Sequence, residues 1–300
     1  LFSNYLFAYQ WVDPEECVEI TGFGKSCPRV SGMEVQQIPN IVHFIFGLKK
    51  DFGGKPFGIL QYLSVVSAAK RIKPEAIYFY YAYEPQGEWW DRVKEYVTPV
   101  RVELLTHIKT TYIKHTAHRA DLLRMLILRE KGGIYLDLDT IVLRSFDELR
   151  SHSMVMGKES EVEGGLGGLA NAVFLTRPHS DFIEAWAKSY AYWNDDHWGG
   201  FSVELPSQMA KDYPDWITVL PQRAFFYPHW DARSLERMFL NDKRQPPLDW
   251  SQSYVVHLWE TKSYEKYIKY WTVDYLRGSS CHICSEIQDL LPNDSRTLQP

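Results

Sequence analysis

One helix–strand block constrains the fold of this chain more than any other feature. Apolar residues recur at helical spacing over 116–130, and the glycine pair at 132–133 marks the end of the predicted helix. The apolar strand expected over 134–136 then runs directly into two acidic residues, Asp137 and Asp139. The block therefore predicts a helix packed beside a buried strand that ends in carboxylates.

The other apolar segments alternate between strand and helix patterns. Strands are expected over 41–46, 76–81, 100–105, 154–158, 172–176, 217–220 and 254–258. Helices are expected over 57–71, 88–96, 180–192 and 206–212. This alternation predicts an α/β fold with a mostly parallel central sheet flanked by helices. In such sheets the ligand crevice lies beyond the carboxyl ends of the strands, where Asp137 and Asp139 are placed.

The length of 300 residues suits one α/β domain with an extension. We expect an N-terminal arm over 1–37, a main domain over 38–260 and a C-terminal extension over 261–300. The apolar start, Leu1 to Val12, is either the remnant of a trimmed membrane anchor or a packed arm, and the sequence leaves both open.

The charge distribution excludes one class of partner. The formal net charge is −5 and no basic block is present, so nucleic acid is not expected as a partner. A nucleoside diphosphate stays compatible with this charge because a metal ion can neutralise its phosphates locally.

Asp137 and Asp139 lie two residues apart, so in extended chain their carboxylates face the same way. Two close carboxylates repel each other, and a shared proton or a cation relieves that repulsion. Mn²⁺ and Mg²⁺ prefer oxygen ligands and bridge readily to phosphates. A bare Asp-x-Asp pattern also occurs in solvated turns, so its context decides its meaning.

The context consists of His118-Arg119-Ala120-Asp121-Leu122-Leu123-Arg124 and of Gly132 to Asp139, with further segments from 38–44 to His257-Leu258-Trp259. Together these motifs resemble glycosyltransferase family 32. The same block is similar to the catalytic core of the glucosylating clostridial toxins. The resemblance implies a GT-A fold for the main domain and transfer of a hexose with retention of anomeric configuration.

The resemblance also implies the roles of individual residues. Asp137, Asp139 and His257 would hold Mn²⁺ or Mg²⁺, and Asp137 would contact the donor as well. Asp121 and Arg124, one helical turn apart, would bind the donor sugar and phosphate, and Asn171 would lie near the reacting carbon. The alternatives are a surface salt bridge for the first pair, a packed histidine for His257 and a turn residue for Asn171.

The opening strand supplies three candidate donor contacts, His43, Phe44 and Phe46. The two phenylalanines alternate with their neighbours, so one set of side chains faces the crevice, although Phe44 is expected in the core. Phe46 stands where family members often carry tryptophan. Candidates for acceptor contacts are Trp89, Trp90, Trp230 and the segment 193–198.

The expected donor is a nucleotide sugar, with a UDP-hexose favoured over GDP-mannose, and the expected acceptor is a glycan or glycolipid. The resemblance places the chain in the Golgi lumen, as the catalytic part of a type II membrane protein. The alternatives are a glycoside hydrolase and an inactive carbohydrate-binding relative.

The four cysteines, Cys17, Cys27, Cys281 and Cys284, lie near the two ends of the chain. The spacing of Cys17 and Cys27 is wrong for a zinc knuckle, so disulfides or free thiols are favoured over a zinc site.

Overall fold

A computed structural model describes residues 19–20, 24–25, 37–161, 167–193, 196–241, 244 and 246–293. Its centre is a seven-stranded sheet with the order β12-β10-β11-β8-β3-β4-β5. The strands are β3 (Ile41–Ile45), β4 (Ala76–Tyr81), β5 (Thr98–Arg101), β8 (Gly133–Leu136), β10 (Met154–Lys158), β11 (Leu169–Thr176) and β12 (Thr218–Leu220). The pairs β3–β4, β3–β8, β4–β5 and β10–β12 are parallel, and β11 runs antiparallel to both β8 and β10. The predicted mostly parallel α/β sheet is confirmed.

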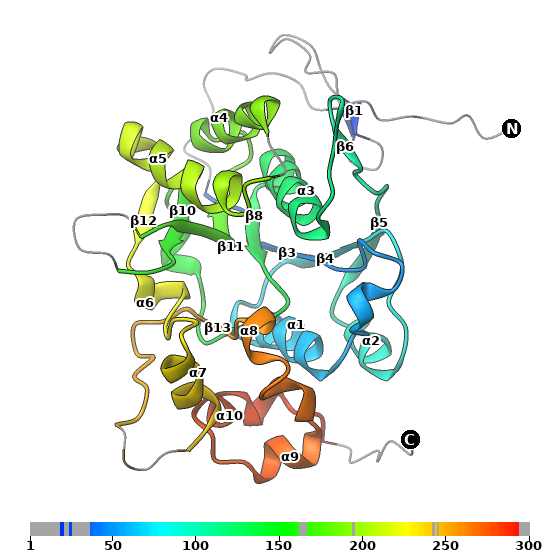
Figure 1. Cartoon of the computed structure of the whole chain (residues 1–300), viewed down its shortest axis with the longest axis vertical. Helices are drawn as coiled ribbons and strands as arrows, with labels where there is room; N and C mark the ends of the chain where they lie inside the picture. The colour runs from blue at the N-terminus through cyan, green and yellow to red at the C-terminus, as the bar shows by residue number, and fades with distance from the viewer. Residues whose placement is uncertain are drawn as a thin grey trace, which may run out of the picture.

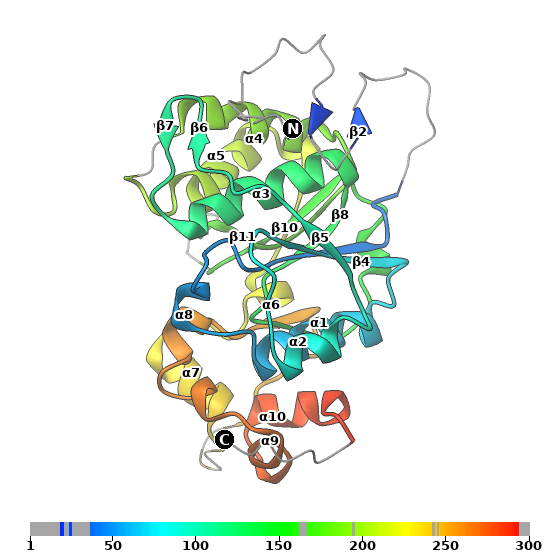
Figure 2. The same cartoon turned by 90° about the vertical axis from the view of Figure 1, so that its right-hand side faces the viewer.

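Helices cover both faces of this sheet (Figures 1 and 2). One face carries α3 (Thr116–Lys131), α4 (Asp181–Ser189) and α5 (Leu205–Asp212). The other face carries α1 (Ile59–Arg71), α2 (Glu88–Val93), α6 (Gln222–Phe225), α7 (Ala232–Phe239), α8 (Glu260–Ser263), α9 (Val273–Gly278) and α10 (His282–Ile287). Within the described ranges, the model holds no helix with the length and apolarity needed to cross a bilayer.

The alternation of side chains along β8 divides the core in two. Ile134 and Leu136 pack in the cluster beneath α1, whereas Tyr135 packs in the cluster beneath α3 and α4. All three side chains are buried, as expected for a strand with helices on both faces.

Among the described residues, three short antiparallel pairs lie outside the main sheet. They are β1–β2 (Glu19–Ile20 with Gly24–Lys25), β6–β7 (His107–Ile108 with Thr111–Tyr112) and β9–β13 (Thr140–Val142 with Val255–His257). In the last pair His257 lies opposite Thr140. This register brings the end of the chain's last strand beside the residues that follow β8.

The sequence predicted the strands of the main sheet and helices α1 to α5, with differences at several ends, and did not predict α6 to α10. β5 begins at Thr98 and ends at Arg101, so most of the segment expected as a strand over 100–105 lies beyond it. α2 ends at Val93 instead of residue 96, α4 ends at Ser189 instead of residue 192, and β11 begins at Leu169 instead of residue 172. Element ends are the least reliable part of a prediction from sequence pattern.

The C-terminal extension packs against the main domain through α1. Arg71 donates hydrogen bonds to the backbone oxygens of Val142 and Glu286, both at 2.6 Å, and pairs with Asp289 at 2.7 Å. Leu276 and Ile283 belong to the same hydrophobic cluster as α1. Residues beyond the predicted domain boundary thus share the core of the main domain.

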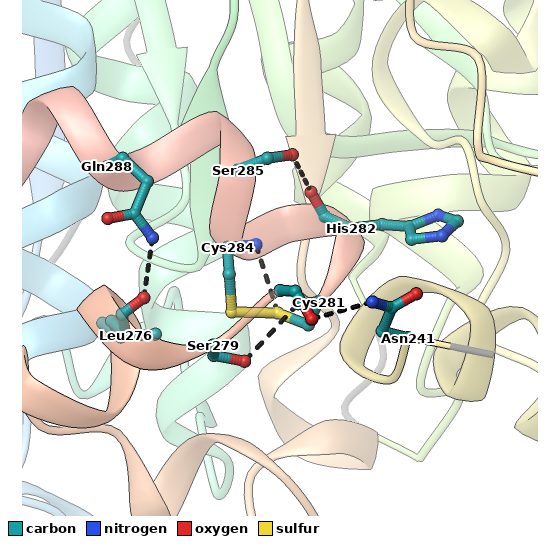
Figure 3. The surroundings of a disulfide bond; sticks show 9 residues. Asn241, Leu276, Ser279, Cys281, His282, Cys284, Ser285 and Gln288 are labelled. Carbon is teal, nitrogen blue, oxygen red and sulfur yellow. Dashed lines mark hydrogen bonds between the residues drawn. A yellow bond between two sulfur atoms is a disulfide. The ribbon is translucent and has the colours of Figure 1, made fainter. Parts of the chain in front are cut away.

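Cys281 and Cys284 form a disulfide at the start of α10 (Figure 3). The Sγ atom of Cys281 also accepts a hydrogen bond from the backbone N–H of Cys284, and both residues are buried. Zinc is therefore not held by this pair. Cys17 and Cys27 lie outside the described residues.

Removing this disulfide is expected to lower stability only modestly. The cysteines are three positions apart, and so short a loop constrains the unfolded chain little, by about 2 kcal/mol in the loop-entropy model. The double variant Cys281→Ser/Cys284→Ala keeps an oxygen acceptor at the helix start, and denaturant unfolding measures its stability. A loss above about 5 kcal/mol would show that the bond organises the packing of the extension.

An ion-paired histidine ties α3 to α4. His179 Nδ1 lies 2.8 Å from Glu184 Oε1, and Arg129 Nε donates to the same oxygen at 3.0 Å. The hydrogen bond to Glu184 is the main cause that raises the pKa of His179. Burial would raise the pKa of Glu184, but the hydrogen bonds from His179 and Arg129 outweigh it and lower that pKa to about 2.

Replacing His179 with asparagine, which tolerates its positive φ, is expected to destabilise the protein in a pH-dependent way. Because the pKa of His179 is higher in the folded protein than in the unfolded chain, protonation of His179 stabilises the fold. This stabilisation is fully present below the unfolded pKa of 6.5 and is lost as the pH rises through the folded pKa. The melting-temperature difference from wild type should therefore be larger near about pH 5.5 than near about pH 9. Equal differences at both pH values would contradict this.

Candidate metal and sugar site

Three potential metal ligands meet at the carboxyl end of β8. Asp137 and Asp139 follow the strand directly, and His257 ends β13. One ligand atom from each residue lies within 4.8 Å of the other two. Two carboxylate oxygens and one imidazole nitrogen suit a divalent cation such as Mn²⁺, so these residues fit the metal that the sequence implies.

The hydrogen bonds around Asp139 and His257 fix their orientation. Asp139 Oδ2 accepts from the backbone N–H of Glu260 at 2.8 Å, and Asp139 Oδ1 lies 3.4 Å from His257 Nε2. His257 Nδ1 accepts from the backbone N–H of Trp259 at 3.1 Å. Asp139 and His257 are therefore held in place by the start of α8 before any ligand binds.

Arg124 links the acidic pair to α3. Its Nη1 lies 3.1 Å from Asp137 Oδ1 and donates to the backbone oxygen of Asn171 at 3.0 Å and to its Oδ1 at 3.2 Å. The guanidinium is buried and lies over the ring of Tyr135, 4.4 Å from its centroid. One side chain thus joins α3, β11 and the residues after β8.

Asp121 lies one turn before Arg124 on the same helix. Its Oδ1 accepts a hydrogen bond from Asn171 Nδ2 at 2.9 Å and lies 3.5 Å from Arg124 Nη2. The structure thus brings together all three residues expected to carry the sugar chemistry. Asp121 and Arg124 are not a surface salt bridge, because both side chains are largely buried.

Crowding of acidic groups changes the proton affinity of this site. Burial raises the pKa of Asp137, with Asp139 adding to the shift while Arg124 opposes it. Burial likewise raises the pKa of Glu260, and Asp139 contributes through repulsion. A bound cation would remove this repulsion, which is the electrostatic reason for the cluster to hold one.

Two tyrosines belong to the site and were not predicted. Tyr135 Oη donates to Asp137 Oδ1 at 2.7 Å, and the same-face spacing of residues 135 and 137 on a strand was available in the sequence. The buried hydroxyl of Tyr190 has no hydrogen-bond partner. It lies close enough to Asp121 and Arg124 for their charges to affect its pKa, which burial raises. Tyr190 lies on the turn after α4, and no local pattern marks it.

The three candidates on β3 and directly after it differ in exposure. His43 and Phe44 are fully buried, and His43 lies within hydrogen-bonding distance of Tyr80 Oη and the Gly132 backbone oxygen. Burial lowers the pKa of His43 to about 3, so the ring is neutral. Neither side chain offers a face to a nucleotide base. Phe46 is partly exposed and stacks on Phe52 at 5.6 Å, so it alone is retained as a stacking candidate.

The candidate acceptor tryptophans also separate by exposure. Trp90 is fully buried and Trp193 nearly so, whereas Trp198 and Trp230 are 63% and 41% exposed. Trp89 is partly buried against the core. Only the exposed residues offer a ring face to a ligand.

Comparison with known proteins agrees with the chemistry of this site. Residues 61–156 match the family described as glycosyltransferase sugar-binding region containing DXD motif. This segment holds Asp121, Arg124, Asp137 and Asp139. The match ends before Asn171 and His257, which reach the site through the fold.

Two curated relatives and one solved structure are similar to this chain. Glucan organizing enzyme 1 of Cryptococcus neoformans is 34% identical over 78% of the chain and 65% of the relative. Human lactosylceramide 4-alpha-galactosyltransferase is 27% identical over 48% of the chain and 42% of the relative. The glycosyltransferase GlyE of Streptococcus pneumoniae is 13% identical over 86% of the chain and 61% of that structure, with a TM-score of 0.48. The chain therefore spans less than two thirds of either curated relative.

Proposed function

We propose that this chain transfers a hexose from a nucleoside diphosphate sugar to a hydroxyl group, because residues 61–156 match the DXD-containing sugar-binding region of glycosyltransferases. The observation that carries the proposal is the Asp137, Asp139 and His257 group lying directly beside the Arg124, Asp121 and Asn171 network. A cation site beside hydrogen-bonding side chains suits a diphosphate sugar, because its phosphates can bind the cation and its hydroxyls can bond to the polar groups.

The proposed reaction is a substitution at the anomeric carbon of the donor. The bond from that carbon to the diphosphate oxygen breaks, and the acceptor oxygen forms the new bond while its proton leaves to the diphosphate or to solvent. When bound, Mn²⁺ or Mg²⁺ supplies positive charge that stabilises the departing diphosphate.

The protein's own part is positioning and charge stabilisation. Arg124 supplies a fixed positive charge beside Asp137, and Asp121 and Asn171 offer hydrogen-bonding atoms for sugar hydroxyls. These groups are ordered before the donor binds, so little reorganisation is needed at the moment of reaction. The proposed retention of configuration then follows from attack of the acceptor oxygen on the face that the leaving group vacates, a route that needs no protein nucleophile.

A UDP-hexose is the favoured donor and GDP-mannose the second, with a glycan or glycolipid as acceptor. The Golgi lumen is the proposed location. The Cys281–Cys284 disulfide supports a secretory compartment, because disulfides persist in oxidising surroundings.

Donor hydrolysis in the absence of acceptor tests the proposal. UDP-glucose, UDP-galactose, UDP-N-acetylglucosamine and GDP-mannose are incubated with Mn²⁺, and with EDTA as the control. Release of nucleoside diphosphate from one donor, lost with EDTA, is the expected result. Cleavage of a glycoside without nucleotide or metal would instead identify a hydrolase, and stable donor binding without turnover an inactive relative.

A further inference from the structure

A row of aromatic rings leads away from the metal group. His257 lies 4.3 Å from Trp259 between ring centroids, Trp259 lies 5.9 Å from His229, and His229 lies 4.7 Å from Trp230. The innermost ring belongs to a predicted metal ligand, whereas Trp230 is 41% exposed. We call Trp259, His229 and Trp230 the aromatic platform.

The platform is tied together by contacts between segments far apart in sequence. Trp259 Nε1 donates to the backbone oxygen of Pro228 at 3.0 Å, and the Trp259 ring lies 5.9 Å from that of Phe226. Trp230 Nε1 donates to Glu159 Oε1 at 3.1 Å, just beyond the end of β10. The segment between α6 and α7 is therefore held against the start of α8, on one side of the sheet in both views (Figures 1 and 2).

Charged groups border the exposed end of the platform. Glu159 accepts the indole N–H, and Lys262 Nζ lies 5.4 Å from the centroid of the Trp230 ring. Such a border suits a ligand that has an apolar face and hydroxyl groups at its edge. A sugar ring has this character, because its C–H groups can pack on an indole while its hydroxyls bond to the carboxylate and the ammonium.

The position of the platform favours the acceptor over the nucleotide as its ligand. Phe46, the remaining candidate for base stacking, follows β3, whereas Glu159 follows β10, and β8 with the metal group lies between them in the sheet. The Glu159 carboxylate accepts hydrogen bonds from neutral hydroxyls but repels phosphate. We propose that the aromatic platform binds a sugar ring of the acceptor, an inference that rests on the proposed function.

Saccharide binding and donor hydrolysis test this proposal separately. The probes are lactose, maltotriose, cellotriose, laminaritriose and mannotriose, each titrated by calorimetry into protein loaded with Mn²⁺ and UDP. Wild type is expected to bind at least one probe, and Trp230→Ala is expected to weaken that binding about tenfold or more, which corresponds to about 1.4 kcal/mol. Trp230→Phe should retain part of the affinity because it keeps an aromatic face.

The matched control is Tyr270→Ala. Tyr270 is 59% exposed, and Lys269 Nζ lies 5.2 Å from its ring centroid. It thus has the same combination of an exposed ring and a lysine as Trp230, but it lies on the 3-10 turn Ile268–Tyr270 and has no ring contact with a platform residue in the described part of the chain. Its removal should leave saccharide binding unchanged. UDP affinity should be equal to wild type in Trp230→Ala.

Three results with the variants would overturn the platform assignment. These are unchanged saccharide affinity in Trp230→Ala, loss of UDP affinity in that variant, and loss of saccharide affinity in Trp198→Ala instead. Failure of all five probes to bind wild type would overturn it as well. Absent Mn²⁺-dependent hydrolysis in wild type would instead refute the proposed function, so the two failures are distinguishable.

Discussion

Replacing Asp139 with asparagine is expected to reduce metal-dependent donor hydrolysis by at least about 10³-fold, equivalent to about 4 kcal/mol of transition-state stabilisation. Asp139 offers one carboxylate oxygen to the predicted metal group and uses the other to accept the Glu260 backbone N–H. Asparagine keeps an oxygen for that hydrogen bond and removes the charge. The variant therefore separates the structural contact from metal binding.

Thermal unfolding with and without Mn²⁺ provides the second measurement. Without metal, the melting temperature of Asp139→Asn should not fall, because one source of repulsion with Asp137 and Glu260 is gone. The stabilisation that Mn²⁺ and UDP give to wild type should disappear in the variant. Full activity together with wild-type metal stabilisation would exclude Asp139 as a ligand.

Replacing Arg124 with methionine is expected to lower both stability and activity. Arg124 is 5% exposed and lies 3.1 Å from Asp137, so its loss removes a buried positive charge from beside this carboxylate, which keeps its hydrogen bond from Tyr135. Breaking a buried pair in this way destabilises by about 3–5 kcal/mol. Denaturant unfolding measures the loss, and donor hydrolysis should fall by about 10²-fold or more because the site loses its fixed positive charge.

Two further variants show whether Arg124 acts on the donor or only on the fold. Arg124→Lys keeps the charge but not the forked geometry that reaches Asp137 and Asn171 together, so activity should stay low while stability is largely recovered. The double variant Arg124→Met/Asp137→Asn should be more stable than the sum of its single changes predicts. Activity in Arg124→Lys equal to wild type would show that a positive charge at this position is sufficient and that the forked geometry is not required.

The local sequence determined the helix, the strand and the acidic pair at its end. The apolar spacing over 116–130 and the following glycine pair predicted α3, and the short apolar run predicted β8. These elements depend on interactions between residues close in the chain, which periodicity records. Helical spacing likewise placed Asp121 and Arg124 on one face of α3. The strand directly before Asp137 and Asp139 placed these two residues together at its carboxyl end.

Only the tertiary structure decided which distant residues join that block. His257 reaches Asp139 because β13 pairs with β9 across more than one hundred residues, and Asn171 reaches Asp121 because β11 lies beside β8. Burial of His43 and Phe44, the unpaired hydroxyl of Tyr190 and the aromatic platform arise in the same way. Strand pairing and packing between layers bring together segments whose separation in sequence carries no periodic pattern, so their contacts follow from the assembled core rather than from local spacing.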